Sequence, residues 1–285
     1  MHFARFRLAL AAALLVAAPA FARDAAPVRQ QQAQGRFIPL EGGRNFRDVG
    51  GYRTSDGHRV KWHVLYRSGS MANLTPAAQA RFNQLNVTSI IDLRSTEERA
   101  RDPNHWQSDT PHGYWARDYS QAQGGSNPLA NPALHSPEAT RQMMITAYRT
   151  LAKDQAASYR ELFARLAAPH QGAVVVNCTA GKDRTGVGTA LVLTALGVPY
   201  STVKQDFLLS NNAPGMATLS KDLSSPMASL PPASLAILAG VEGSYLDATF
   251  TGIRQQYGSV QGYLRTELGV GPRQIAALRR NLLTR

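Results

Sequence analysis

The clearest hydrophobic pattern in the chain is a pair of apolar runs on either side of a polar, glycine-containing stretch. The first run, Ala173-Val174-Val175-Val176, is short and β-branched, which predicts a buried strand. The second run extends from Val187 to Leu196 and is followed by Gly197, which predicts a buried helix with its stop signal. Residues 177–186 therefore connect a strand to the start of a helix.

Other segments show the same alternation of strand-like and helix-like patterns. The sequence predicts further strands at 37–40, 62–66 and 87–93, and helices at 76–85, 137–150, 154–166, 201–210, 235–257, 260–268 and 272–283. We expect an α/β fold with a central, mostly parallel sheet flanked by helices, followed by an all-helical C-terminal part. Between 101 and 137 the chain is rich in proline, and a loop of this length is usually functional.

The connecting stretch combines an anion site with a nucleophile. Successive backbone N–H groups and the dipole of the following helix converge on one point and favour negative charge. Cys178, the only cysteine, opens the loop, and Arg184 follows six residues later. The helix N-terminus and the guanidinium favour the thiolate, and the arginine fork can bind two oxygens of a phosphate. The pattern predicts nucleophilic attack on a phosphate ester, with no metal and no other cofactor.

The segment Cys178 to Gly186, CTAGKDRTG, resembles the signature of the cysteine-dependent tyrosine phosphatases. It is most similar to the bacterial tyrosine/serine and lipid phosphatases whose loop reads CxAGKDRTG. Three other segments fit this subfamily: Asn45-Phe46-Arg47-Asp48-Val49-Gly50-Gly51, Leu65-Tyr66-Arg67-Ser68-Gly69, and Ile91-Asp92-Leu93-Arg94 followed by Glu97.

The resemblance implies a tyrosine-phosphatase-like fold over residues 36–285. It also implies hydrolysis of a phosphomonoester through a cysteinyl-phosphate intermediate. The expected substrate is phosphotyrosine in proteins, with phosphoserine and phosphothreonine as further candidates, and the alternative is a phosphoinositide. The substrate and the oligomeric state remain open at this stage.

The resemblance also assigns roles within the loop. Cys178 is the expected nucleophile and Arg184 the residue that stabilises the developing charge. Thr185 stands where the family's hydroxyl hydrogen-bonds the sulfur, and Lys182 would add positive charge near the entrance. The expected phosphate-binding residues are Cys178, Thr179, Ala180, Gly181, Lys182, Asp183 and Arg184.

One position departs from the family pattern. Asn177 stands immediately before the cysteine, where the family usually has histidine. An amide can donate a hydrogen bond but cannot become a cation. We therefore expect a working enzyme whose thiol ionises less readily than it would beside a histidine.

The general acid has three candidates. Asp183 lies within the loop and comes first, followed by Asp92 and Asp118, and distance to the leaving oxygen must decide among them. Asp92 has two alternatives to the role of acid: it could orient an active-site arginine, or it could be a structural carboxylate that caps the helix starting near Ser95. There Ser95-x-x-Glu98 forms a plausible capping box.

Several other features allow a functional and a structural interpretation. Arg47 and Asp48 either support the site or form a turn with a surface ion pair. The aromatic residues of the 101–137 segment either line a pocket or cover the core, and we favour the second. Residues 211–232 form either a lid or a surface excursion.

The N-terminus is typical of an exported protein. Arg5 and Arg7 precede an apolar stretch of residues 8–18 that is too short to span a membrane, and Ala20-Phe21-Ala22 is a cleavage signal. We expect a signal peptide at 1–22, a disordered mature N-terminus at 23–35, and a periplasmic or secreted enzyme. No later stretch is long enough for a transmembrane helix.

The charge, the loop sequence and the cysteine count argue against several other classes of protein. The net charge of +12 is spread along the chain, so we expect no nucleic-acid partner, although a positive field would attract phosphorylated substrates. A nucleotide-binding Walker loop is excluded because Val176 and Asp183 stand where it needs glycine and serine or threonine. Arsenate reduction would need further cysteines. A non-catalytic phosphate-binding module remains, and only turnover separates it from an enzyme.

Overall fold

The computed structural model describes residues 35–104, 113–120, 132–169, 172–217 and 230–284. Its contacts separate residues 1–35 from a compact unit, Arg36–Arg285, and the description below concerns that unit. The signal peptide and nearly all of the expected disordered N-terminus lie outside the described residues.

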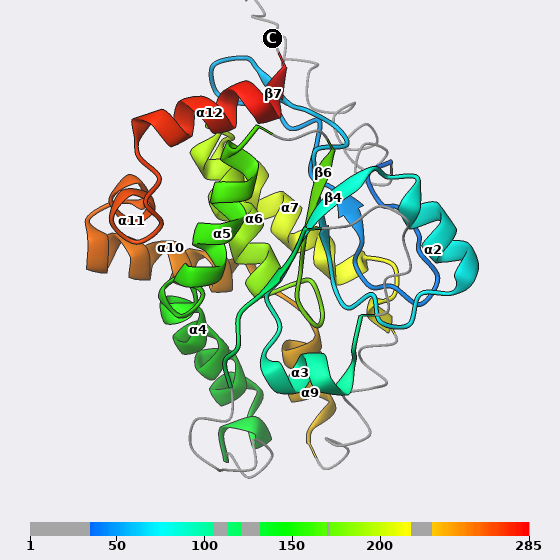
Figure 1. Ribbon diagram of the computed structural model, residues 1–285. Coiled ribbons are helices and arrows are strands. Elements are labelled where there is room, and N and C mark those ends of the chain that lie inside the picture. The colour runs from blue at the N-terminus through cyan, green and yellow to red at the C-terminus, as the bar shows by residue number, and fades with distance from the viewer. Residues whose placement is uncertain (1–34, 105–112, 121–131, 170–171, 218–229, 285) are drawn as a thin grey trace, which may run out of the picture. The chain divides into compact units, whose positions relative to one another are not determined.

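The central sheet has five strands in the order β1-β3-β6-β4-β5 (Figure 1). Neighbours pair in parallel except at the β1 edge, where the pairing with β3 is antiparallel. The bounds of the strands are Arg47–Asp48 for β1, Leu65–Ser68 for β3, Val87–Asp92 for β4, Gly113–Ala116 for β5 and Ala173–Asn177 for β6. A second, two-stranded sheet joins β2 (Arg59–Val60) to β7 (Leu283–Thr284).

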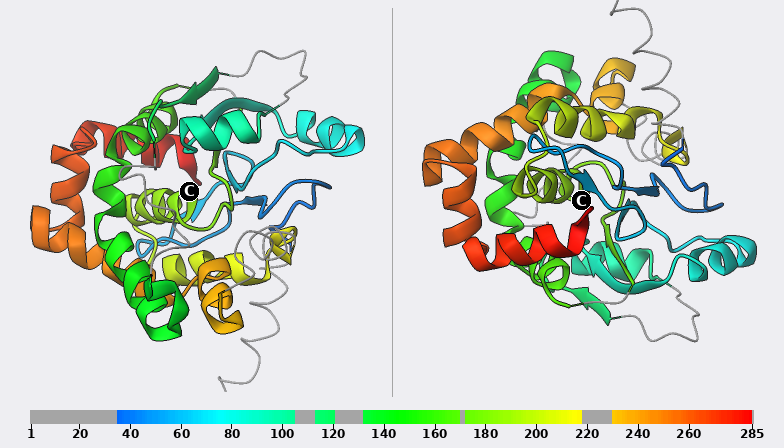
Figure 2. Two further views of the ribbon diagram at one scale, coloured as in Figure 1. Left: turned by 90° about the horizontal axis from the view of Figure 1, so that it is seen from below. Right: turned by 90° about the horizontal axis from the view of Figure 1, so that it is seen from above.

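Helices cover both faces of the central sheet (Figure 2). Those described are α2 (Pro76–Asn83), α3 (Thr96–Arg101), α4 (Pro137–Asp154), α5 (Ala156–Ala167), α6 (Arg184–Ala195), α7 (Tyr200–Leu208), α9 (Pro232–Ala239), α10 (Gly243–Tyr257), α11 (Val260–Thr266) and α12 (Pro272–Leu282), with 3₁₀ turns at η2 (Pro132–His135) and η3 (Leu209–Asn212). The mostly parallel α/β fold and the helical C-terminal part are therefore confirmed.

The central strand β6 contributes to two hydrophobic cores. Val174 and Val176 belong to the larger core beneath the helices of the C-terminal half, whereas Ala173 and Val175 belong to a smaller core beneath α2. A strand that is buried on both faces has no polar face, which explains its continuous apolar sequence.

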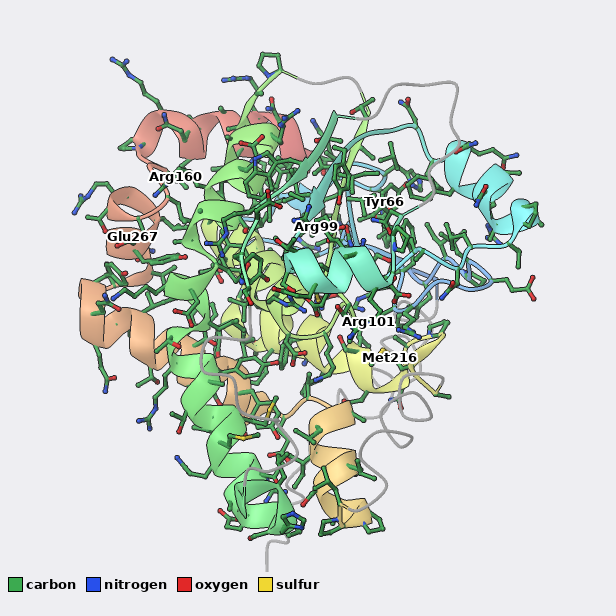
Figure 3. The ribbon with its side chains drawn as sticks, turned by 60° about the horizontal axis from the view of Figure 1, so that its bottom comes forward. Tyr66, Arg99, Arg101, Arg160, Met216 and Glu267 are labelled. Carbon is green, nitrogen blue, oxygen red and sulfur yellow. The ribbon has the colours of Figure 1, made fainter. Side chains whose placement is uncertain are left out.

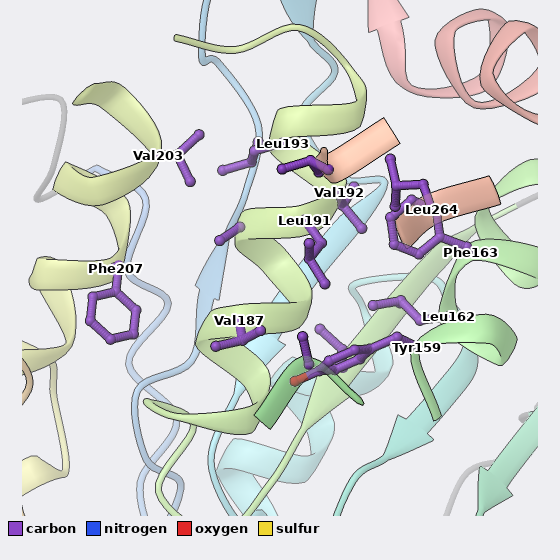
Figure 4. Packing of buried hydrophobic residues seen from close by; sticks show 14 of the residues in the cluster. Tyr159, Leu162, Phe163, Val187, Leu191, Val192, Leu193, Val203, Phe207 and Leu264 are labelled. Atoms are coloured by element: carbon purple, nitrogen blue, oxygen red, sulfur yellow. The ribbon is translucent and has the colours of Figure 1, made fainter. Parts of the chain in front are cut away.

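Helix α6 is embedded in the larger core. Its side chains, including Leu191 and Val192, pack between α5 and α7 (Figure 4). Full burial of one such side chain stabilises the fold by roughly 1.5–3 kcal/mol. The packing therefore holds the helix N-terminus, and with it the loop that precedes it, in a fixed place at the carboxyl end of β6.

Three sequence predictions about elements need correction. The segment 101–137 contains a strand, β5, which pairs with β4 along Ser89 to Asp92. The helix predicted at 235–257 is two helices, because the Asn211 side chain bonds both the N–H and the carbonyl of Val241 in the turn between them. The predicted strand at 37–40 is reduced to a single bridge between Phe37 and Arg47.

Within the described residues, no helix combines the length and apolar character needed to cross a membrane.

Candidate active site

The loop between β6 and α6 rests on the end of the neighbouring strand β3. The N–H of Cys178 donates to the Ser68 carbonyl, and the N–H of Ser70 donates to the Thr179 carbonyl (2.9 Å). Gly181 has a positive φ of 70°, and a Cβ there would lie 2.4 Å from the Gly69 nitrogen. Only glycine fits this close approach, so Gly181 allows the loop to pack directly against the end of β3.

The Cys178 side chain is buried at the base of the loop. Its Sγ accepts a hydrogen bond from the N–H of Gly181 at 3.3 Å. The loop runs directly into the N-terminus of α6, where free backbone N–H groups can bind an anion. The hydroxyl proton of Thr185, for which the family resemblance implies a bond to the sulfur, is donated to the Ser68 carbonyl (3.3 Å).

Arg184 is fixed by helix α3, which follows β4 at the same end of the sheet (Figures 1 and 3). Its Nη1 and Nη2 donate to the two carboxylate oxygens of Glu98 at 2.6 and 2.7 Å. Nη1 also donates to the Leu93 carbonyl and to the Tyr119 hydroxyl. The guanidinium is therefore held in one plane before any ligand arrives.

Glu98 links the start of α3 to the loop. The predicted capping box is present, with Ser95 as N-cap and Glu98 as its partner. The same carboxylate also accepts the Thr179 hydroxyl. Burial alone would raise the pKa of Glu98, but the hydrogen bonds and charge of Arg184, with Thr179, lower it to about 2.

Glu98→Gln should weaken the pH dependence of the free energy of unfolding at acid pH. A carboxylate with a lowered pKa stabilises the fold above its unfolded pKa, near 4.5, and loses that contribution as the pH falls toward 2. The contribution is roughly 3 kcal/mol at neutral pH. Urea unfolding at pH 6, 4 and 3 measures it, with Glu138→Gln on an exposed pair as control. Parallel pH curves for wild type and Glu98→Gln would contradict the assignment.

Asp183 lies at the N-terminus of α6 but does not cap it with its side chain. Its Oδ1 instead accepts the Tyr148 hydroxyl and the Lys182 ammonium (2.9 Å). The Lys182 side chain is buried and also donates to the Gly240 carbonyl. The expectation that Lys182 places its charge at the entrance is therefore wrong, because Asp183 and Gly240 hold the ammonium inside.

Asp92 is fully buried and serves as an acceptor. Its two oxygens receive the Arg94 guanidinium, the side-chain amides of Asn104 and Asn177, and the Tyr114 hydroxyl. Both oxygens are occupied by these donors and neither faces the cavity lining, so the geometry does not favour a role as general acid. Its structural interpretation needs correction too, because Ser95, and not Asp92, caps α3.

Asp118 is exposed and pairs with Arg99 on α3. Surface pairs of this kind contribute little, and Asp118 is not among the residues that line the cavity beside the loop. The side-chain amide of Asn177 donates to Asp92, and its side-chain oxygen Oδ1 is buried without a hydrogen-bond partner among the described residues.

A buried polar network supports the loop from below. Asn45 donates to the Gly181 carbonyl at 2.9 Å, and Arg67 donates to the same oxygen at 2.8 Å. Arg47 donates to the side-chain oxygen Oδ1 of Asn45, and both arginines donate to the carboxylate of Asp206.

Burial and the nearby Arg67 charge lower the pKa of Arg47 to about 10. Burial alone would raise the pKa of Asp206, but Arg47, Arg67 and Arg36 hold it well below its usual range.

Arg47 and Asp48 thus differ in what they do. Arg47 belongs to the network under the loop. Asp48 accepts the backbone N–H groups of Gly50 and His63 and shapes the adjoining turn, and both side chains are buried. Arg47 and Asp48 do not form a surface ion pair with each other, and Asp48 instead lies 3.1 Å from the ring nitrogen of the exposed His63.

A cavity of about 760 Å³ opens beside the loop. It is lined by Arg117, Tyr119, Ser120, Met144, Ala147, Tyr148, Leu151, Asp154, Gln155, Asp183 and Arg184. Helix α4 contributes the apolar wall, and the loop contributes Asp183 and Arg184 at one end. The aromatic residues of the 101–137 segment serve both of the roles that the sequence allowed. Trp115 packs on the core, whereas Tyr119 accepts a hydrogen bond from Arg184 and lines the cavity. Trp106 lies outside the described residues.

The sequence profile of the tyrosine phosphatase family matches residues 38–284. The chain belongs to the tyrosine phosphatase family. A Cupriavidus necator protein that carries the name of a tyrosine-protein phosphatase is 33% identical over 244 residues, which cover 81% of this chain and 84% of the relative.

Two further relatives share this family. The triple specificity protein phosphatase PtpB of Mycobacterium tuberculosis is 28% identical over 277 residues, covering 86% of this chain and 98% of PtpB. A tyrosine-protein phosphatase of Nostoc commune is 27% identical over 221 residues, covering 76% of this chain and 73% of the relative.

Three residues of this tyrosine phosphatase contact the loop or the network beneath it in ways that the sequence does not indicate. The sequence predicts Glu98 only as a helix cap, yet it also orients Arg184. Tyr148 and Asp206 lie in helices whose sequences are typical of ordinary surface or core helices. The described part of the candidate lid packs Ala213 and Met216 against Ala180, whereas residues 218–229 lie outside the described residues.

Proposed function

We propose that this tyrosine phosphatase hydrolyses phosphotyrosine in proteins through a cysteinyl-phosphate intermediate. The observation that carries the proposal is the convergence of three groups on one loop. Cys178 offers the nucleophile at its base, Arg184 is held in a fixed plane, and Asp183 faces the adjoining cavity.

In the first displacement the Cys178 thiolate attacks phosphorus. The sulfur–phosphorus bond forms while the bond from phosphorus to the leaving oxygen breaks, and a proton moves from Asp183 to that oxygen. Arg184 and the loop N–H groups stabilise the negative charge on the equatorial oxygens. Because Glu98 already orients the guanidinium, little reorganisation accompanies the reaction.

In the second displacement water attacks the cysteinyl phosphate. The Asp183 carboxylate takes a proton from that water, the sulfur–phosphorus bond breaks, and inorganic phosphate leaves with Cys178 again a thiolate. Asp183 returns to its protonated form, so the cycle balances without a cofactor.

The cavity favours an aromatic phosphate ester. Its volume lies within the range of sites that enclose small molecules. Met144, Ala147 and Leu151 form an apolar wall against which a phenol ring can pack, while the phosphate reaches Arg184. The inositol hydroxyl groups that meet this apolar wall would be buried there without a hydrogen bond, at a cost in binding.

The test is a set of kcat/KM values on matched substrates. We expect kcat/KM for a phosphotyrosine peptide to be at least about tenfold higher than kcat/KM for the same peptide with phosphoserine. It should exceed kcat/KM for a soluble phosphoinositide by the same margin. A preference for the phosphoinositide would overturn the substrate assignment. Absence of turnover on all three would support the non-catalytic alternative and overturn the proposal as a whole.

We further propose export of the enzyme with cleavage after Ala22. The supporting features are the basic start, the short apolar stretch and the Ala20-Phe21-Ala22 sequence. Mass measurement of the enzyme from fractionated cells tests it. A chain that begins at Arg23 outside the cytoplasm is expected, and an uncleaved cytoplasmic chain would contradict the proposal.

A further inference from the structure

The hydroxyl of Tyr148, in the middle of α4, donates directly to Oδ1 of Asp183. This contact is unusual for its place in the fold. An aspartate at a helix N-terminus ordinarily accepts the first free N–H groups of its own helix. Asp183 makes no such bond to α6, and its carboxylate is turned to Tyr148 instead.

The position of Tyr148 is set by ring packing and by a hydrogen bond of its backbone. Its ring is buried, with an edge contact to Phe207 and a tilted contact to Tyr245. Its backbone carbonyl accepts the Thr249 hydroxyl at 2.8 Å, which joins α4 to α10. The hydroxyl therefore has a fixed place over the loop.

Tyr148 is the donor in this contact. Burial, followed by the neighbouring Asp183, raises its pKa well above the ordinary value near 10. The phenol keeps its proton, and that proton is committed to Asp183 Oδ1.

The second donor to Asp183 reaches the same oxygen. The Lys182 ammonium lies 2.9 Å from Oδ1 and 3.1 Å from the Gly240 carbonyl, which holds it in place. Both hydrogen bonds that the described residues make to the Asp183 side chain thus end on Oδ1. Oδ2 is the oxygen left to carry a proton, and Asp183 lines the cavity that the leaving group would occupy.

We propose that Tyr148 is a positioning residue that makes Asp183 an effective general acid. By occupying Oδ1, its hydroxyl directs the acidic proton to Oδ2, on the side of the leaving oxygen. The proton passes from Oδ2 to that oxygen as the phosphorus–oxygen bond breaks, and Tyr148 keeps its own proton throughout. This inference rests on the proposed function, because it assigns a partner to the acid of that reaction.

Tyr148→Phe tests the inference because it removes one oxygen and keeps the ring. A phenolate leaving group needs protonation, whereas 2,4-dinitrophenolate leaves without it, so the two substrates separate acid catalysis from everything else. We expect kcat/KM for phenyl phosphate to fall by about tenfold or more, and kcat/KM for 2,4-dinitrophenyl phosphate to change less than about threefold. The ratio kcat/KM reports the first displacement, in which the acid acts.

Tyr263→Phe is the matched control. Its hydroxyl is also buried and donates to a carbonyl of α4, that of Ala152, but it does not contact the loop. This variant should lose stability without changing the ratio of the two substrates. An equal fall on both substrates in Tyr148→Phe, or no fall on either, would overturn the inference.

A double-mutant cycle adds a second readout. In an Asp183→Asn background the acid is absent, so Tyr148→Phe should change phenyl phosphate hydrolysis by less than about twofold. Additive losses would contradict the coupling. Failure of the proposed function itself is distinguishable, because wild type would then hydrolyse neither aryl phosphate.

Discussion

Cys178→Ser should abolish phosphatase activity while leaving the fold intact. We expect kcat on 4-nitrophenyl phosphate to fall by at least ~10⁴-fold, because a serine hydroxyl is not ionised in this loop and no other nucleophile replaces it. The side chain is buried and accepts only the Gly181 N–H among the described hydrogen bonds, and an oxygen can accept the same bond.

Two measurements accompany this variant. Urea unfolding should give a stability close to that of wild type, which shows that lost activity is not lost structure. Inorganic phosphate should still raise the melting temperature, because Arg184 and the loop N–H groups remain. Activity within about tenfold of wild type would mean that the thiol is not the nucleophile.

Asp206→Asn should cause a large loss of folding stability. The asparagine keeps the shape of the side chain but leaves Arg47 and Arg67 buried without a counter-charge. Breaking a buried pair in this way typically costs about 3–5 kcal/mol, and two cations share this carboxylate. The loop should suffer as well, since Arg67 also donates to the Gly181 carbonyl.

Urea unfolding measures the effect, with Asp247→Asn as the matched control. Asp247 also pairs with a cation, Lys204, but its side chain is about half exposed, so its loss should cost no more than about 1 kcal/mol. Equal destabilisation by the two substitutions would show that the buried network beneath the loop contributes no more to folding stability than an exposed ion pair.

The strand–loop–helix unit can be predicted because its signals are local. The run from Ala173 to Val176 is apolar on every residue because both faces of β6 are buried. Helix α6 is apolar on nearly all sides because it is embedded in the core. A loop between two such elements that contains a cysteine and an arginine allows few alternative interpretations. The spacing of Cys178 and Arg184 is therefore enough to single them out as candidates for the nucleophile and the phosphate-binding residue.

The partners of these residues could not be predicted because they come from distant parts of the chain. Glu98 reaches Arg184 across 86 residues, and Tyr148 reaches Asp183 across 35. The capping pattern of Glu98 is correct but incomplete. Nothing in the sequence of α7 distinguishes Asp206 from a surface carboxylate, although it is buried between two arginines.

The choice among the aspartates required distances. Asp92 ends a buried strand beside the loop, which makes it a reasonable candidate, but its oxygens are filled by donors from four residues. Asp183 lines the cavity with one oxygen committed and one left. Strand β5 could not be predicted for a related reason, because its pairing with β4 depends on a partner far away in sequence.

The most direct test of the account is to trap the intermediate. The enzyme is mixed with 2,4-dinitrophenyl phosphate, quenched with acid within milliseconds, digested and analysed by mass spectrometry. We predict one phosphoryl group on the peptide that contains Cys178, attached to sulfur, and none in Cys178→Ser. Turnover with a phosphoryl group on another residue, or with no phosphorylated enzyme at any quench time, would contradict the cysteinyl-phosphate mechanism.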